Sequence, residues 1–138
     1  MLIGELATKT GLSVDTLRYY EKIGLVPRPL RDAGGRRVYD TGILRWMRFL
    51  DRLKATGLAM RERLRYAELR DQPGLASVRE RREMLENHRE KVASDLVKLQ
   101  ETLELLDEKV DLYRRIESGD VPDPLAELAN SVSKPRDA

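Results

Sequence analysis

The chain has 138 residues, 41% apolar and 36% charged, which is enough for one compact domain with an extension but not for two large cores. It contains no cysteine and one histidine. This excludes disulfides, thiolate metal sensing and iron–sulfur ligation, and it leaves too few ligands for an ordinary zinc site.

The net charge of +2 is unevenly distributed along the chain. Residues 1–70 contain 15 Lys and Arg against 8 Asp and Glu, a balance of +7, whereas residues 71–138 have a balance of −5. We therefore expect the amino-terminal half to contact a polyanion, and the acidic half to repel nucleic acid.

Nothing in the sequence predicts an export signal or a membrane segment. The amino terminus offers no basic segment leading into an apolar run, and no apolar stretch approaches the ~18 residues that a spanning helix needs. A soluble cytoplasmic protein is the expectation.

Two short helices joined by a glycine turn are predicted first. Residues 3–9 have helical apolar spacing and end before Gly11. Residues 14–22 form the second helix, with Ser13 as its N-cap and Gly24 as its left-handed terminator. This order is typical of a helix-turn-helix unit.

A β-hairpin is predicted next, because Pro27 and Pro29 forbid continuation of the helix. Residues 32–35, Asp-Ala-Gly-Gly, indicate a tight turn between a strand at Leu30 and another at 36–39. We interpret this hairpin as a wing.

Two further helices complete the basic half. The third is predicted over about 41–55 and the fourth over about 59–70. Trp46 and Phe49 are expected to pack in the core between them. The Gln-Pro-Gly segment at 72–74 then ends this region.

A long helix is predicted over about 76–117, and its apolar residues recur every seven positions in two rows, as in a coiled-coil seam. Arg82 and Arg89 occupy the start of the second row. We therefore expect the tight seam over about 92–113 and the earlier turns against another part of a dimer. The predicted dimerisation residues are Val92, Leu96, Leu99, Leu103, Leu106, Val110 and Tyr113.

The expected fold is thus mainly α, with three parts. Residues 1–72 form a winged helix-turn-helix DNA-binding domain with a small β-hairpin wing, and residues 75–117 form the coiled-coil dimerisation helix. Residues 118–138 are a short tail, partly disordered or partner-binding, with at most a short amphipathic turn at Leu125, Leu128, Ala129 and Val132.

One face of the second helix has the chemistry of a DNA reader. Asp15, Arg18, Tyr19 and Lys22 share the face opposite the apolar one. Arg18 can present a bidentate fork to guanine or phosphate, and Tyr19 can donate its hydroxyl to a phosphate oxygen. The alternative is a set of ordinary surface charges on an amphipathic helix.

The wing and the fourth helix add further arginines. Arg36 and Arg37 are expected at the base of the protruding loop, where they either lie along a phosphate backbone or simply make the hairpin soluble. The positive surface is expected to be extended, with several side chains pointing away from DNA, by Arg45, Arg48, Arg52, Lys54, Arg61, Arg63 and Arg65. Of these, Arg61 is favoured, because a helix N-terminus also offers backbone N–H groups to phosphate.

The run T-L-R-Y-Y-E-K-I-G-L at 16–25, with Ile3–Ala7, Thr10–Ser13, Arg37–Tyr39 and Gly57-Leu58, resembles the MerR family of winged helix-turn-helix transcription regulators. The resemblance is dense over about residues 1–70. The long helix matches the architecture of the family without sharing much of its sequence.

The resemblance implies which residues contact DNA. Arg18, Tyr19, Arg37 and Tyr39 match family positions that contact it, mostly through its backbone. Arg36 departs from the family, which usually has an aromatic residue there. The full predicted DNA-binding set is Ser13, Thr16, Arg18, Tyr19, Lys22, Arg36, Arg37, Tyr39 and Arg61.

The resemblance also implies a mechanism. Family members dimerise through antiparallel long helices and read a palindromic promoter element, which they bend and untwist so that RNA polymerase can engage an over-long promoter. Such deformation contributes sequence preference without base contacts. The implied partners are double-stranded promoter DNA, a second copy and RNA polymerase, with no cofactor, metal or membrane.

The signal that controls such a regulator is left open. Metal- and redox-responsive relatives use cysteines, which this chain lacks. The tail is too short to enclose a drug-sized molecule unaided, which leaves a pocket at the dimer interface or a protein partner. His88 is expected to be a solvated helix residue rather than a sensor.

Two other functions fit the sequence. One is an architectural or recombination accessory protein that shapes DNA with the same winged fold. The other is a coiled-coil adapter whose basic half binds an acidic protein. An enzyme is least favoured, because no carboxylate pair, nucleophile–base set or phosphate-cradling glycine loop occurs.

Overall fold

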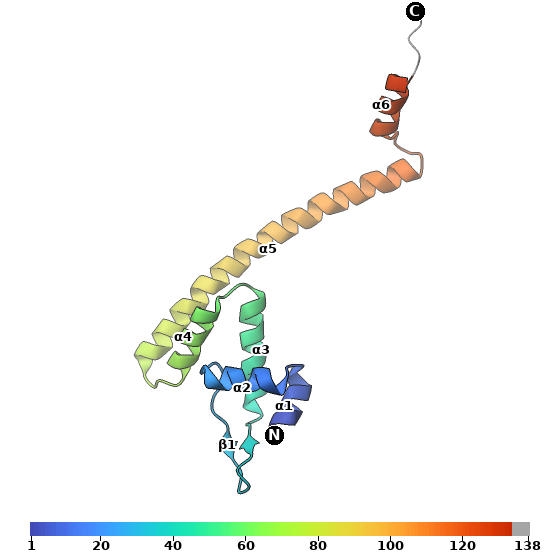
Figure 1. Cartoon of the computed structure of the whole chain (residues 1–138). Coiled ribbons are helices and arrows are strands. Elements are labelled where there is room, and N and C mark those ends of the chain that lie inside the picture. The colour runs from blue at the N-terminus through green and yellow to red at the C-terminus, as the bar shows by residue number, and fades with distance from the viewer. Residues whose placement is uncertain (134–138) are drawn as a thin grey trace, which may run out of the picture. The chain divides into compact units, whose positions relative to one another are not determined.

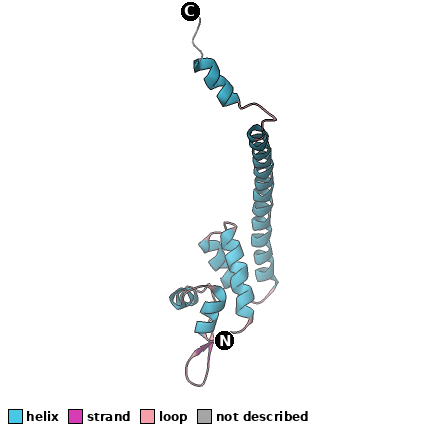
Figure 2. Ribbon diagram, turned by 90° about the vertical axis from the view of Figure 1, so that its right-hand side faces the viewer, coloured by secondary structure: helices cyan, strands magenta, loops and turns pink. Residues whose placement is uncertain are grey.

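The computed structural model describes residues 1–133 and consists of two compact units, Met1–Val92 and a second that begins at Ala93. It contains helices α1 to α6 and a single two-stranded hairpin (Figures 1 and 2). The mainly α fold with a hairpin and one long helix, predicted from the sequence, is confirmed.

The first two helices have the predicted bounds to within a residue. α1 spans Ile3–Thr10 and α2 spans Val14–Lys22. Ser13 caps α2, since its hydroxyl oxygen accepts a hydrogen bond from the Thr16 backbone N–H at 3.1 Å. Gly24 lies at φ +84°, the left-handed conformation that ends a helix at little cost for glycine.

The wing is a short antiparallel hairpin. β1 is Leu30–Arg31 and β2 is Arg37–Val38, with Leu30 opposite Val38. Both views show the hairpin projecting beyond the helices of its unit (Figures 1 and 2). Leu2 forms an additional bridge to Val38, which ties the wing to the start of α1.

α3 (Gly42–Ala55) and α4 (Met60–Arg70) close the core. The buried Trp46 side chain stacks on Tyr66, with ring centroids 5.7 Å apart, and its indole N–H donates to the Leu25 carbonyl at 3.0 Å. Trp46 therefore joins α3 to α4, as the sequence predicted, and it also reaches the loop after α2. The core position predicted for Phe49 is wrong: its side chain is exposed, although its ring lies 5.8 Å from that of Tyr66 at the edge of this cluster.

α5 spans Leu75–Glu117 as one continuous helix. Its first turns pack on their own chain: Leu85 packs against the core and the Ser77 hydroxyl donates to the carbonyl of Leu69. The expectation that these turns lie against another part of a dimer is therefore wrong for Leu85. His88 also differs from the expectation, because it is buried against the turn between α3 and α4.

The second unit contains the rest of α5 and then α6, Pro124–Ser133. Asp123 caps α6 by accepting the Leu125 backbone N–H at 3.0 Å. The tail thus holds a helix of ten residues rather than a single turn. Residues 134–138, part of the predicted tail, lie outside the described residues. In the described part of the chain, no helix has the length and apolar content needed to cross a bilayer.

A matched pair of leucine substitutions tests the position of the core. Leu6→Ala is expected to lower the free energy of unfolding by about 2–5 kcal/mol, because Leu6 is fully buried. Leu30→Ala removes the same atoms from a side chain that is 81% exposed and should change it by no more than about 0.5 kcal/mol. Urea unfolding followed by circular dichroism measures both, and equal effects would contradict this core.

Candidate nucleic-acid interface

The exposed face of α2 carries three of the predicted DNA-binding side chains. Arg18, Tyr19 and Lys22 are exposed, while Leu17 on the opposite face is 1% exposed. Helical periodicity produces this division, since the apolar residue anchors the helix and leaves the polar ones outside. Arg18, Tyr19 and Lys22 are therefore open to a partner.

The wing turn is organised by one carboxylate. Asp32 Oδ1 accepts hydrogen bonds from the backbone N–H groups of Gly34 and Arg36, at 3.0 and 2.9 Å. Its second oxygen lies 3.2 Å from Nε of Arg36. Gly35 lies at φ +81°, which only glycine adopts readily. The turn is thus ordered by its own hydrogen bonds, although Arg36 is mostly exposed.

Four arginines line a groove of about 550 Å³ between the wing, α1 and α2, which we call the wing groove. They are Arg18 from α2, Arg31 from β1, and Arg36 and Arg37 after the turn. Residues 2–5 also line the wing groove, and the acidic one among them, Glu5, pairs with Lys9 at 3.3 Å. Several guanidinium groups around one concave surface create a positive potential that suits a phosphate backbone.

Glu21 connects the wing to α2. Its carboxylate lies 3.1 Å from Nε of Arg37, an ion pair in which both side chains are largely buried. The same carboxylate accepts a hydrogen bond from the Tyr39 hydroxyl at 3.3 Å. One acidic side chain on α2 therefore fixes Arg37 of β2 and Tyr39, which follows this strand.

Tyr39 is placed differently from the rest of the predicted set. Its side chain is only 3% exposed and belongs to the core, and its hydroxyl is used within the protein by Glu21. Burial, and then the negative charge of Glu21, raise the pKa of Tyr39 above its ordinary value. Tyr39 is thus a positioning residue for Glu21, and the DNA contact implied for it stays a prediction.

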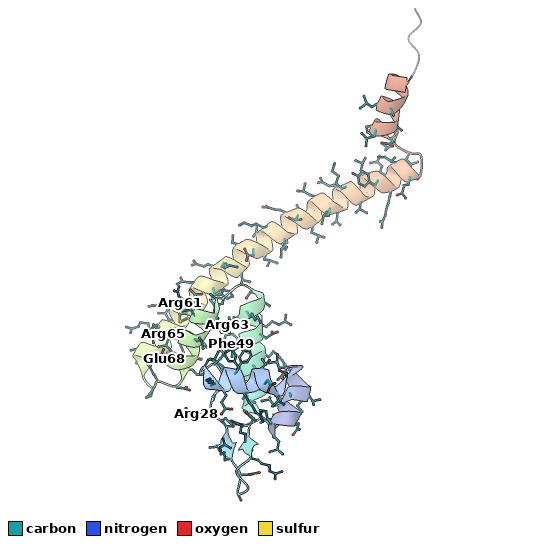
Figure 3. The ribbon with its side chains drawn as sticks, in the orientation of Figure 1. Arg28, Phe49, Arg61, Arg63, Arg65 and Glu68 are labelled. Atoms are coloured by element: carbon teal, nitrogen blue, oxygen red, sulfur yellow. The ribbon has the colours of Figure 1, made fainter. Side chains whose placement is uncertain are left out.

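Three of the four arginines of α4 belong to the predicted positive surface, and their environments differ. Arg61 is exposed, and Figure 3 shows it on α4 beside α5 rather than at the wing. Arg63 is buried and donates from Nε to the Leu58 carbonyl at 3.1 Å. Nη2 of Arg65 lies 3.0 and 3.1 Å from the two carboxylate oxygens of Glu80. The expectation that all three extend the positive surface is therefore wrong for Arg63, and Arg61 does not line the wing groove.

Sequence reasoning missed Arg31 and gave Glu21 no role. Nη1 of Arg31 donates to the Gly35 carbonyl at 2.6 Å, which places its charge at the mouth of the turn. The hairpin register pairs Arg31 with Arg37 and could have revealed it. No local pattern reports the Glu21 contacts, because their partners lie more than fifteen residues away along the chain.

The predicted dimerisation residues form an apolar row that the described part of the chain leaves largely exposed. Leu96, Leu99, Leu103, Leu106, Val110 and Tyr113 are 46–67% exposed, whereas Val92 is partly buried. Exposed leucines repeated every three and four positions along a helix are typical of a surface that another helix covers.

Comparison with known proteins finds a matching family model for the amino-terminal region and relatives over most of the chain. Residues 2–39 match the model of the MerR family regulatory proteins. The chain is 35% identical to an HTH-type transcriptional regulator of Haemophilus influenzae, over 79% of this chain and 80% of the relative. It is 34% identical to the HTH-type transcriptional regulator YyaN of Bacillus subtilis, over 83% and 91%.

Two solved structures share the fold of this protein over most of its chain. A MerR family transcriptional regulator from Listeria monocytogenes aligns with a TM-score of 0.75 and 31% identity, covering 96% of this chain and 99% of that one. HiNmlR, a MerR family regulator that lacks the sensor domain and was crystallised on promoter DNA, aligns with a TM-score of 0.73 and 32% identity, covering 85% and 92%.

The raised pKa of Tyr39 makes a prediction about alkaline stability. The pKa of Tyr39 is higher in the folded protein than the ordinary 10.0 of an unfolded chain, so the protonated phenol stabilises the folded state. This contribution is fully present below the unfolded-state pKa, and it is lost as the pH rises through the folded-state pKa. As the pH rises above the ordinary pKa of 10.0, Tyr39→Phe should therefore lose less unfolding free energy than the parent protein.

Urea unfolding at several pH values measures this difference, with Tyr19→Phe as the control because Tyr19 is 54% exposed. If Tyr39→Phe and the parent protein lose stability equally above pH ~10, the burial of the Tyr39 phenol beside Glu21 is contradicted.

Proposed function

The chain belongs to the MerR family of DNA-binding transcriptional regulators, and from that premise we propose that it acts as a homodimer which binds a palindromic promoter element and distorts it. The single observation that carries this proposal is the continuity of the exposed face of α2 with the wing groove and its four arginines.

Each part of this surface has a physical role. In the proposal, α2 lies in the major groove, where Arg18 reaches a guanine edge or a phosphate, and Tyr19 and Lys22 contact the backbone. Ser13 and Thr16, at the first turn of α2, add hydroxyl contacts. Guanidinium groups of the wing groove follow the adjacent phosphates, and Arg61 contacts phosphate beyond the wing groove.

The homodimer is supported by the exposed seam. Leu96, Leu99 and Leu103 are more than half exposed in one chain, and burying them against a second copy would stabilise a helix as polar as α5. A two-fold dimer presents two identical DNA-binding surfaces, which is why we expect the DNA site to be a palindrome.

Distortion of the DNA and contact with RNA polymerase complete the proposal. Many phosphate contacts can offset the energy of bending and untwisting a duplex, and the bend then adds specificity at positions that the protein does not touch. The relative HiNmlR, crystallised on promoter DNA, supports a promoter as the target. We place the activity in the cytoplasm, where promoter DNA and RNA polymerase meet.

The test starts from the DNA upstream of the protein's own gene. Titration of labelled duplexes, followed by footprinting, is expected to reveal one protected palindrome near the promoter. Transcription from that fragment with purified RNA polymerase should change when the protein is added. Binding without any effect on transcription would favour an architectural role. Absence of salt-sensitive binding to any duplex would favour the adapter instead.

Substitutions in the interface should weaken DNA binding and leave the dimer intact. Arg18→Ala is expected to lower operator affinity about 100-fold or more, because each of two protomers loses a charged contact worth about 1.5–3 kcal/mol. Arg37→Ala should lower it at least as much, because it also removes the partner of Glu21 that fixes the wing. The slope of log affinity against log salt should fall by about 2 for the dimer. Fluorescence anisotropy at several salt concentrations measures both quantities.

The control for these variants is Arg79→Ala, which removes the same charge from an exposed position on α5. If this change weakens binding as much as the two interface variants do, general charge rather than the proposed surface determines affinity. Dissociation of the Arg18→Ala dimer would contradict the assignment of Arg18 to the DNA surface.

The seam is tested by two leucines on different faces of α5. Leu103→Asp places a charge in the predicted seam and should weaken dimerisation by about 100-fold or more, and DNA binding only as a consequence. Leu105→Asp should leave the dimer intact, because Leu105 is 63% exposed but lies outside both seam rows. Analytical ultracentrifugation compares the two, and a stable Leu103→Asp dimer would show that the seam is misplaced.

A further inference from the structure

His88 has an unexpected environment for a histidine in a run of charged residues. It is 8% exposed, and its Nε2 lies 2.7 Å from the hydroxyl oxygen of Thr56. Thr56 is the C-cap residue of α3. The contact therefore joins α5 to the turn between α3 and α4. Neither the DNA surface nor the dimer seam uses it.

The direction of this hydrogen bond follows from the neighbours of Thr56. The hydroxyl lies 2.7 Å from the Arg52 carbonyl and 3.3 Å from the Leu53 carbonyl, and both oxygens can only accept. The single hydroxyl proton is therefore directed into the last turn of α3, and the oxygen is left to accept. His88 must then carry a proton on Nε2 and act as the donor.

Lys91 contacts the same residue one turn further along α5. Its ammonium donates to the Thr56 backbone carbonyl at 3.0 Å, at the C-terminal end of α3, where the helix dipole favours a positive charge. Residues three apart lie on one face of a helix, so His88 and Lys91 reach Thr56 together. A Cβ on Gly57 would lie 2.9 Å from the Lys91 ammonium, which shows how closely the turn approaches α5.

This set of Thr56, His88 and Lys91, which we call the Thr56 clasp, attaches the turn between α3 and α4 to α5. A second polar attachment lies near the start of α5, where Ser77 donates to the Leu69 carbonyl and Glu80 pairs with Arg65. The two attachments are about three turns apart on α5. Together with the packing of Leu85 against the core, they fix the direction of α4 along this part of α5.

We propose that the Thr56 clasp sets the orientation of the DNA-binding helices on α5 and thereby selects the half-site spacing that the dimer accepts. His88 and Lys91 are positioning residues in this proposal, because they act through the turn between α3 and α4 and touch no DNA. The proposal rests on the dimeric DNA binding proposed above. It deepens that function by naming residues that determine specificity.

The physical basis is that α5 continues without interruption from the clasp into the predicted seam. In the proposal, a residue that holds the α3–α4 turn on positions 88 and 91 holds it on the same helix that carries the predicted seam. The DNA-binding surfaces then meet the duplex at a set separation and phase, and a site with another spacing must be deformed to fit.

The first arm of the experiment needs no DNA. The backbone N–H groups of Gly57 and Leu58 donate to the carbonyls of Lys54 and Leu53, so their hydrogen exchange reports on the turn. We expect His88→Ala to accelerate exchange of these two amides about tenfold, as for the loss of one hydrogen bond. His88→Gln, whose amide can also donate, should preserve their protection.

The second arm measures affinity for the mapped operator and for versions with its two half-sites moved apart or together by one and two base pairs. The parent protein should prefer the natural spacing. In His88→Ala and in Thr56→Val, which keeps the shape of Thr56 but removes its hydroxyl, this preference should fall about tenfold. The control is Arg89→Ala, which alters an exposed neighbour of His88.

Each outcome decides one of the two claims. Unchanged exchange at Gly57 and Leu58 in His88→Ala would overturn the clasp, whether or not DNA is bound. Faster exchange with an undiminished spacing preference would overturn its role in specificity. If the parent protein binds no duplex, the proposed function fails, and the spacing claim fails with it. If Arg89→Ala reproduces the effects of His88→Ala, the assignment to His88 is wrong.

Discussion

The ion pair between Glu21 and Arg37 is the contact on which the candidate DNA surface depends. A hairpin of two-residue strands has little stability of its own, so something outside it must fix its direction relative to α2. Glu21 does this from α2, with its carboxylate shared between Arg37 and the buried Tyr39. Because the pair is partly buried, with Arg37 29% and Glu21 15% exposed, removal of either partner would leave a partly desolvated charge, which costs more than the loss of an exposed ion pair.

The rest of the first unit supports this contact. Trp46 joins α3 to α4 and to the loop after α2, and Leu17 anchors the inner face of α2. Because these contacts fix α2 on the core, the exposed cations on its outer face, Arg18 and Lys22, have defined positions. Positive charges placed in advance around a groove lose less conformational entropy on contact with phosphate than charges on a free segment do.

The two halves of the chain differ in the sign of their charge balance. Residues 1–70 have a charge balance of +7, which favours contact with a polyanion, whereas residues 71–138 have a balance of −5, which disfavours it. The Thr56 clasp lies where α5 packs on the helices of the basic half.

The sequence by itself determined the order and type of elements, because helix caps, glycine terminators and apolar periodicity are local signals. Ser13, Gly24 and the seven-residue repeat of α5 are examples. It also identified the exposed face of α2, since periodicity alone separates Arg18 from Leu17. Tertiary structure decided everything that depends on partners distant along the chain. It buried Tyr39 beside Glu21 and Arg63 beside Leu58, brought Arg31 into the wing groove, and placed His88 against Thr56. The physical reason is that burial and hydrogen bonding of a polar side chain depend on which elements pack around it, and no local pattern of residues reports that packing.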